Sequence, residues 1–152
     1  MAKKVDRSVN EMLVSLFNTV LETESKAVVT GDFSDITEND MHIIEAIGVG
    51  EPKKASDIAK KMGVTAGTIT VNMNSLEKKG YILRQRSSED KRIVNTSLTE
   101  RGKKAYYHHR DFHKHMIKAA IKGFNESEME VLVSCLKKLV DFFEDYEIPK
   151  DL

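Results

Sequence analysis

The sequence lacks the features typical of membrane-spanning and secreted proteins. No apolar run approaches the roughly 18–20 residues of a membrane span, and the start, MAKKVDRSVN, has no apolar stretch behind its charges. Its single cysteine, Cys135, excludes an internal disulfide, and the apolar residues around it predict a thiol in a helix core. We therefore expect a cytoplasmic protein that does not associate with membranes.

Motifs of catalysis are also missing. The sequence contains no G-x-S-x-G, P-loop, H-E-x-x-H or dinucleotide-binding glycine pattern, and its carboxylates are scattered. We expect neither enzymatic activity nor a cofactor. No repeat, low-complexity tract or Pro/Gly-rich linker interrupts the 152 residues, so the sequence predicts one continuous domain.

The formal net charge is zero, but the positive and negative residues are concentrated in different parts of the sequence. Residues 52–104 hold thirteen Lys and Arg against five Asp and Glu, a local charge of +8, so the remainder carries −8. A basic block inside an acidic frame is typical of a module that binds a polyanion. A solvated basic face would give the same count, so charge alone leaves both interpretations open.

Apolar periodicity predicts helices before and within this block. One helix should cover about residues 7–29, and a second should begin after Thr37 and end near Gly48. A short helix over 55–62 ends at Gly63, and the next begins after Thr65 and ends at residue 80. Two short helices joined by a tight glycine-containing turn form a helix-turn-helix.

After residue 80 the period changes to two. Residues 81–86 and 93–98 are strand-like and flank the polar loop 87–91, which predicts a β wing. A long helix capped by Thr99 should run to about residue 122, and Asn125 with Glu128 should open the last helix. The last helix has a long apolar stripe, which predicts burial against a partner subunit; packing within the same chain is the alternative.

These elements predict a mainly α fold with a small β wing, a winged helix-turn-helix with about six helices. We expect one domain over residues 1–152. Within it, 35–99 would be the winged region, and 1–34 and 100–152 would be dimerisation helices from both termini.

The run over residues 55–102 resembles the DNA-binding half of the MarR family. The specific matches are LEKKGYI (76–82), SSEDKR (87–92) and SLTERG (97–102), in that order. The resemblance implies a dimeric repressor that binds double-stranded DNA. Two identical recognition helices on a two-fold axis imply a pseudo-palindromic operator.

Four segments are similar to the fatty-acid-biosynthesis repressors of Gram-positive bacteria: NEMLVSLFNTVLE, ITENDMHIIEAIG, VTAGTITVNMNSLEKKGY and RDFHKHM. That resemblance implies that an acyl chain on acyl carrier protein acts as corepressor. Seven apolar residues are candidates for an acyl pocket, with ordinary core packing as the alternative: Leu13, Leu16, Phe17, Val20, Met41, Ile44 and Met116.

A helical wheel of residues 66–78 separates an apolar face from a short polar face that suits the major groove. Asn72 or Asn74 would pair with adenine, and Val71 with a thymine methyl group. Many MarR relatives carry Arg where Val71 stands, so we expect an A/T-leaning operator. Small polar surface residues are the alternative interpretation.

In the wing, Asp90 would orient Arg92 toward the minor groove, although a surface ion pair would look the same. Arg84, Arg86, Lys60 and Lys61 are candidates for phosphate contacts. The predicted DNA-binding set is Thr65, Gly67, Thr68, Thr70, Val71, Asn72, Asn74, Arg84, Arg86, Asp90, Lys91 and Arg92.

A zinc-responsive regulator is an alternative. His109 and His113, at i and i+4, place two imidazoles on one helix face. Glu24 and His42 lie on helices that would pack nearby, and zinc-sensing MarR proteins look similar at these positions. The fatty-acid repressors also carry histidines there, so the histidines do not separate the two interpretations. Solvated or core histidines are the favoured explanation, and our main expectation is no metal.

Overall fold

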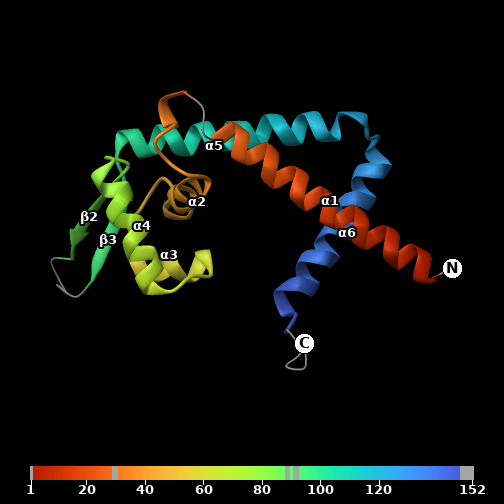
Figure 1. Ribbon diagram of the computed structural model, residues 1–152, viewed down its shortest axis with the longest axis horizontal. Helices are drawn as coiled ribbons and strands as arrows, with labels where there is room; N and C mark the ends of the chain where they lie inside the picture. Colours follow the sequence, from red (N-terminus) through yellow and green to blue (C-terminus); the bar gives the residue numbers. More distant parts are fainter. Residues whose placement is uncertain (1, 29–30, 88–89, 91–92, 148–152) are drawn as a thin grey trace. The chain divides into compact units, whose positions relative to one another are not determined.

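A computed structural model describes residues 2–28, 31–87, 90 and 93–147 (Figure 1). The elements are α1 (Ala2–Val28), η1 (Gly31–Phe33), α2 (Glu38–Ile47), β1 (Lys53–Lys54), α3 (Ala55–Met62), α4 (Ala66–Lys78), β2 (Ile82–Arg86), β3 (Val94–Leu98), α5 (Glu100–Ala120), η2 (Ile121–Gly123) and α6 (Glu126–Asp145). The predicted mainly α fold with a small β wing is confirmed.

The chain folds into two compact units, Met1–Phe112 and His113–Leu152. The boundary falls inside α5, whereas the sequence predicts one domain with its internal boundaries near residues 35 and 99. The single domain, with its dimerisation helices, therefore stays a prediction.

The first unit has a continuous apolar core around α2. Met41, Ile43 and Ile44 have no exposed surface, and they are joined by residues from α3, α4 and the strands. Burying each such side chain contributes roughly 1.5–3 kcal/mol. The other members are Ile36, Ala46, Ile47, Ile58, Ala59, Ile69, Met73, Leu76, Tyr81, Ile82, Leu98 and Ala105.

Capping interactions confirm the predicted starts of α2 and α4 and the predicted end of α3, whereas α1 begins at Ala2 and not near residue 7. The Thr37 hydroxyl accepts a hydrogen bond from the Asp40 N–H, and the Asp40 carboxylate accepts one from the Thr37 N–H, both at 3.1 Å. Gly63 closes α3 in the left-handed conformation, with φ of 65°. Thr65 caps α4 through the Thr68 N–H. These caps fix where the helix-turn-helix begins and turns.

The wing is an antiparallel hairpin of β2 and β3, in which Ile82 pairs with Leu98 and Arg86 with Val94. β1 pairs with the other edge of β3 and makes the order β1-β3-β2. We did not predict β1, because a strand of two residues leaves no period to detect.

The base of the wing is fixed by a close approach and a polar cluster. A Cβ on Gly102 would lie 2.0 Å from the Tyr81 carbonyl oxygen, so only glycine fits there. The buried Tyr81 hydroxyl donates to the Asp35 carboxylate at 2.6 Å, and the Arg101 guanidinium lies 4.3 Å from the centre of the Tyr81 ring. These contacts join the segment before α2 to the start of β2 and of α5.

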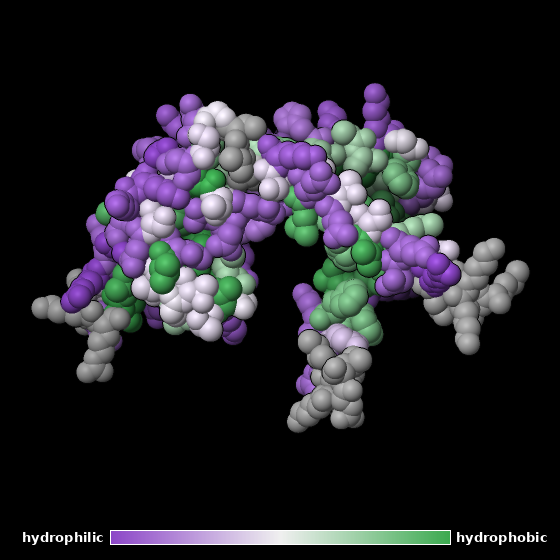
Figure 2. Space-filling view, viewed as in Figure 1, coloured by the Kyte–Doolittle hydropathy of each residue, from purple (hydrophilic) through white to green (hydrophobic). Residues whose placement is uncertain are grey.

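In the second unit, α6 begins with the predicted capping box of Asn125 and Glu128. Within residues 126–145 this helix has no buried side chain, and Val131, Phe142 and Phe143 are each more than half exposed. Green surface covers much of this helix in Figure 2. Cys135 is also exposed, so the expected core thiol is wrong for a single chain.

Candidate nucleic-acid interface

One face of α4 packs into the core and the other faces solvent. Ile69, Met73 and Leu76 are at most 1% exposed, whereas the opposite side is open. Ala66 belongs to the apolar face of the helical wheel, but it is exposed because it is the first residue of the helix. The exposed residues of the helix include Gly67, Thr68, Thr70, Val71, Asn74 and Lys78, and Asn72 is half-buried.

Val71 is the most unusual residue on this face, since a β-branched apolar side chain there is 67% exposed. Apolar residues on a solvent-facing helix surface otherwise lose the burial that stabilises them. Within the described part of the first unit, the Val71 side chain is not packed into the core. Its exposure fits the predicted contact with a thymine methyl group.

The start of α4 has the properties of an anion-binding helix end. Its first turn has no acidic residue, so the partial positive charge of the free N–H groups is not offset. The Thr65 hydroxyl is 3.0 Å from the Thr68 hydroxyl, and the Thr70 hydroxyl donates to the Ala66 carbonyl. The two predicted threonines nearest the start are therefore held by each other.

The hairpin lies directly after α4, as predicted. Beyond the paired strands, the Ser87 N–H donates to the Ile93 carbonyl and the Ile93 N–H to the Asp90 carbonyl, both at 2.9 Å. Arg86 and Asp90 are exposed. The predicted contacts Lys91 and Arg92 lie outside the described residues, so their place in the wing stays a prediction.

Arg84 differs from the expected free phosphate contact. Its Nε donates to the Glu77 carboxylate at 2.9 Å, and its Nη2 donates to the same carboxylate and, at 2.7 Å, to the Asn74 Oδ1. These hydrogen bonds hold the pKa of Glu77 below its usual range. Two predicted DNA contacts, Arg84 and Asn74, are thus hydrogen-bonded to each other, and the acid that pairs with Arg84 was not predicted. Its position one turn after Asn74 was the available signal.

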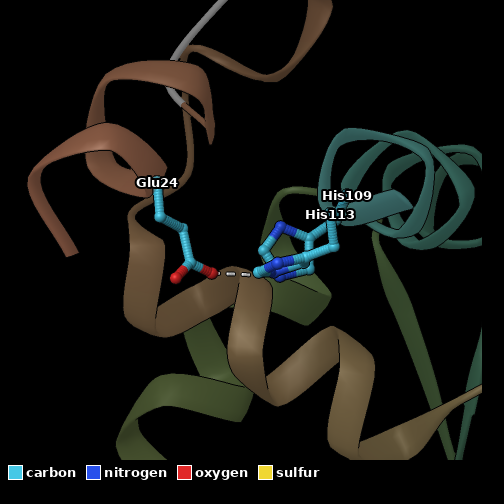
Figure 3. Close-up of side chains that lie close together, drawn as sticks. All are labelled: Glu24, His109 and His113. Atoms are coloured by element: carbon cyan, nitrogen blue, oxygen red, sulfur yellow. Dashed lines mark ion pairs between the residues drawn. The ribbon is translucent and has the colours of Figure 1, made fainter. Parts of the chain in front are cut away.

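The four predicted metal ligands lie on α1, α2 and α5. The Glu24 Oε1 is 2.9 Å from the His42 Nε2 and 3.3 Å from the His109 Nε2. Glu24 and His109 are 5% and 2% exposed, which is rare for groups that carry charge. Figure 3 draws Glu24 with His109 and with His113, which follows one turn later on α5.

A further carboxylate approaches this cluster. Glu38 offers an oxygen within 4.8 Å of ligand atoms of Glu24 and His42, and the Glu45 carboxylate lies 3.7 Å from the His109 Nε2. Carboxylates and imidazoles are both ligands of Zn²⁺. Sequence reasoning identified Glu24, His42 and His109, but the contributions of Glu38 and Glu45 were missed.

The residues proposed for an acyl pocket do not share one environment. Met41 and Ile44 are fully buried in the core, whereas Leu16 and Phe17 are 55% and 57% exposed. Leu13 and Val20 are half-buried on α1, and Met116 is half-buried in the second unit. For Met41 and Ile44 the structure supports the alternative, ordinary core packing. Leu16 instead borders a surface groove along α1, with Met12 and polar side chains.

The comparisons with known proteins agree with this geometry. The family model described as "MarR family" matches residues 36–94. The solved structure of Streptococcus pneumoniae FabT in complex with DNA is 39% identical with a TM-score of 0.88, and the match covers 93% of this chain and 99% of that one. The chain belongs to the MarR family. It is therefore a transcription regulator and not an enzyme.

Curated relatives are more distant. The regulator PchR of Bacillus subtilis is 26% identical over 84% of this chain and 78% of its own length. SarZ of Staphylococcus saprophyticus is 32% identical over 64% of this chain and 62% of its own length. Both are named as helix-turn-helix transcriptional regulators. In the described residues, no helix is both long and apolar enough to cross a membrane.

Proposed function

We propose that this MarR-family chain is a cytoplasmic homodimeric repressor that binds a pseudo-palindromic, A/T-leaning operator. The observation that carries the proposal is the solvent face of α4, where Thr68, Val71 and Asn74 are exposed beside an ordered hairpin. A short-chained helix face of this kind fits the major groove, and methyl groups on it favour thymine. The similar protein FabT was solved in complex with DNA, which supports DNA as the partner of this chain.

The dimer is supported by the apolar surface of α6. Side chains such as Val133, Leu136 and Val140 are 47–59% exposed, and a soluble protein rarely leaves such a stripe in water. A second copy of α6 would cover it. Two copies of α4 would then be set for half-sites about one helical turn apart.

Selection of bound fragments from random DNA tests the operator preference. We expect the full chain to select two A/T-leaning half-sites. Val71→Arg should shift one position of each half-site toward guanine, because Arg pairs with the guanine O6 and N7. Val71→Thr, which keeps one methyl group, is the matched control and should keep the preference. A G/C-rich half-site selected by the unchanged chain would contradict the proposal.

We further propose that the genes controlled are those of fatty-acid biosynthesis, with an acyl chain on acyl carrier protein as corepressor. The support is the four-segment resemblance and the 39% identity with FabT. The exposed apolar residues of α1, which include Met12, Leu16 and Phe17, offer surface to an acyl chain. The basic block over residues 52–104 offers charge complementarity to an acidic carrier protein.

Titration of the operator with and without the carrier tests this effector. We expect acylated carrier protein to tighten operator binding about 5- to 150-fold, the range of typical allosteric coupling. Carrier without its acyl chain is the control and should change nothing. Equal effects of both carriers, or release of DNA by the acylated form, would contradict the corepressor role.

The buried cluster around Glu24 favours a second candidate, a zinc-responsive regulator. Glu24, His42 and His109 already lie within hydrogen-bond or ion-pair distance, and Zn²⁺ takes carboxylate and imidazole ligands at about 2.0–2.2 Å. With His113 as the expected fourth ligand, the set has the number that zinc prefers.

Metal analysis of the purified chain tests the second candidate. If it is correct, the chain holds zinc, a chelator changes operator affinity, and His42→Ala abolishes both effects. His115→Ala, an exposed histidine on the same α5 as His109, is the control. If the purified chain holds no metal and added zinc does not change its affinity for the operator, this candidate is excluded.

A further inference from the structure

The side chains of Asn74, Glu77 and Arg84 form a chain of hydrogen bonds at the junction of α4 and β2. Asn74 and Glu77 lie one turn apart on α4, and Arg84 reaches both of them from the strand. The Arg84 backbone N–H also donates to the Glu77 carboxylate at 3.3 Å. Glu77 therefore holds both the main chain and the guanidinium of Arg84 in place.

This arrangement reduces what Arg84 offers to a phosphate. Its side chain is only 23% exposed and its charge is paired with Glu77. The pKa of Glu77 is lowered chiefly by its hydrogen bond from Arg84, so the acid stays ionised. A guanidinium with a fixed carboxylate partner contributes less net charge to a polyanion than a free one.

The orientation of the Asn74 amide follows from the chemistry of arginine. A guanidinium has only donors, so the atom that faces it must be the Asn74 oxygen. The Nδ2 group of Asn74, with its two donors, therefore lies on the side away from Arg84. Recognition of adenine by asparagine in the usual way needs the amide oxygen and nitrogen together at the base edge. Here one of the two lone pairs of the oxygen is already taken by Arg84, and that bond fixes the direction of the amide.

We propose that Arg84 is a positioning residue that fixes the amide of Asn74, so that Asn74 reads its base as a hydrogen-bond donor. This inference rests on the proposed DNA-binding function. The base edges it would recognise are those with acceptors, such as the O6 and N7 of guanine or the O4 of thymine. Paired use of both amide atoms on adenine, our expectation from sequence, is replaced by a single donor contact.

A double-substitution cycle on operator binding tests the proposal. We expect Asn74→Ala to lower operator affinity by about fivefold or more, the lower end of the range for a bidentate base contact, because a single donor contact is lost in each half-site. Arg84→Gln should give a similar loss, and the double variant should bind no more than about twofold worse than Asn74→Ala. Losses that multiply would show that the two residues act independently, which overturns the proposal.

Base preference and salt dependence provide readouts that a merely structural role would not move. Arg84→Gln should relax selection at the same base position that Asn74→Ala relaxes, with little change in the salt slope. Arg84→Lys keeps the charge but lacks the planar fork, and it should behave like Arg84→Gln. Rescue by Arg84→Lys would instead assign Arg84 a simple electrostatic role.

Arg86→Gln is the matched control, because Arg86 lies on the same strand and is exposed. It should weaken binding to all sequences alike and reduce the salt slope by about one for each subunit of the dimer. If Arg84→Gln behaves in this way, the proposal is wrong. Thermal melting establishes that each variant is folded.

Asn74→Asp keeps an acceptor for Arg84 and therefore leaves the junction of α4 and β2 intact. This variant should lose the base preference, and a retained preference would overturn the assignment of Asn74 as a donor.

Failure of the proposed DNA-binding function and failure of the positioning role of Arg84 give different results. A wild-type chain that selects no DNA sequence would contradict the proposed function itself. A wild-type chain that selects an operator, with an unchanged base preference in Arg84→Gln, would contradict only the positioning role.

Discussion

The two units of the chain use similar helices but differ in what covers them. In the first unit, α2 has Met41, Ile43 and Ile44 fully buried among neighbouring elements. In the second, α6 has a comparable apolar stripe, yet no side chain within residues 126–145 is buried. Both helices begin with the same capping box. Local sequence therefore forms both helices, but only α2 is buried among the other elements of its own unit.

Because of this difference, we expect the two units to be stabilised by different contacts. The first should fold through its own core, whereas the second should depend on a partner for most of its burial free energy. Substitutions in α6 should then change assembly, and substitutions in the first unit should change folding.

The largest effect is expected from a charge placed in the α6 stripe. Leu136→Glu should prevent dimer formation, because a carboxylate cannot be buried there without a partner. Loss of the second half-site should weaken operator binding roughly 10²–10⁴-fold. Sedimentation and an operator titration measure the two effects. Ser134→Glu, on the other side of α6, is the control, and a Leu136→Glu protein that stays dimeric would break the comparison.

The next largest effect is expected at the base of the wing. Gly102→Ala places a Cβ 2.0 Å from the Tyr81 carbonyl oxygen, and the required shift should lower the free energy of unfolding by roughly 3 kcal/mol. Urea unfolding followed by circular dichroism measures it. Gly123→Ala is a matched control, since no atom lies within 4 Å of its added Cβ. If Gly102→Ala and Gly123→Ala are equally stable, the backbone at Tyr81 and Gly102 can move apart at little cost.

The paired capping boxes allow the most direct contrast between the units. Thr37→Ala should lower the stability of the first unit by about 1 kcal/mol. Asn125→Ala removes an equivalent cap on α6, but we expect its effect to appear as about thirtyfold weaker dimerisation, because about 1 kcal/mol is lost from each of the two copies. Urea midpoints at several protein concentrations separate the two. A concentration-independent loss in Asn125→Ala would argue that α6 is stabilised within one chain.

The smallest effect is a pH dependence confined to the first unit. The hydrogen bond from Tyr81 lowers the pKa of Asp35, to which Arg101 adds its charge. A depressed carboxyl pKa stabilises the fold above the unfolded value of about 3.9 and loses that contribution as pH falls through the folded pKa. Stability should thus decline from about pH 4 downward. The decline should be shallower in Asp35→Asn and unchanged in Asp57→Asn, and urea unfolding across this pH range measures it.

The parts of the fold that sequence predicted are those coded locally. Thr37, Gly63 and Thr65 act within one helix turn of themselves, so their residue types were enough to place the boundaries of α2, α3 and α4. The strand pair followed from the change of period after Gly80. The two-residue β1 was missed because it pairs with a strand far along the chain, Lys53 with Thr96.

The site was predictable as a list of residues but not as a set of contacts. The helical wheel found the exposed face of α4, including Val71. It could not show that Arg84 pairs with Glu77 and Asn74, because those bonds depend on how β2 leaves the end of α4. For the proposed acyl-pocket residues Met41 and Ile44, core packing was not distinguished from pocket lining for a related reason. Periodicity identifies apolar faces, but whether Met41 packs into a core or lines a cavity is decided by its neighbours.

The most direct test of the central claim is a hydroxyl-radical footprint of the full chain on DNA that it has itself selected. We predict two protected half-sites on one face of the duplex, about ten base pairs from centre to centre, with protection of both lost together in Leu136→Glu. A single protected half-site, or a footprint unchanged in that variant, would contradict a dimer that presents α4 twice.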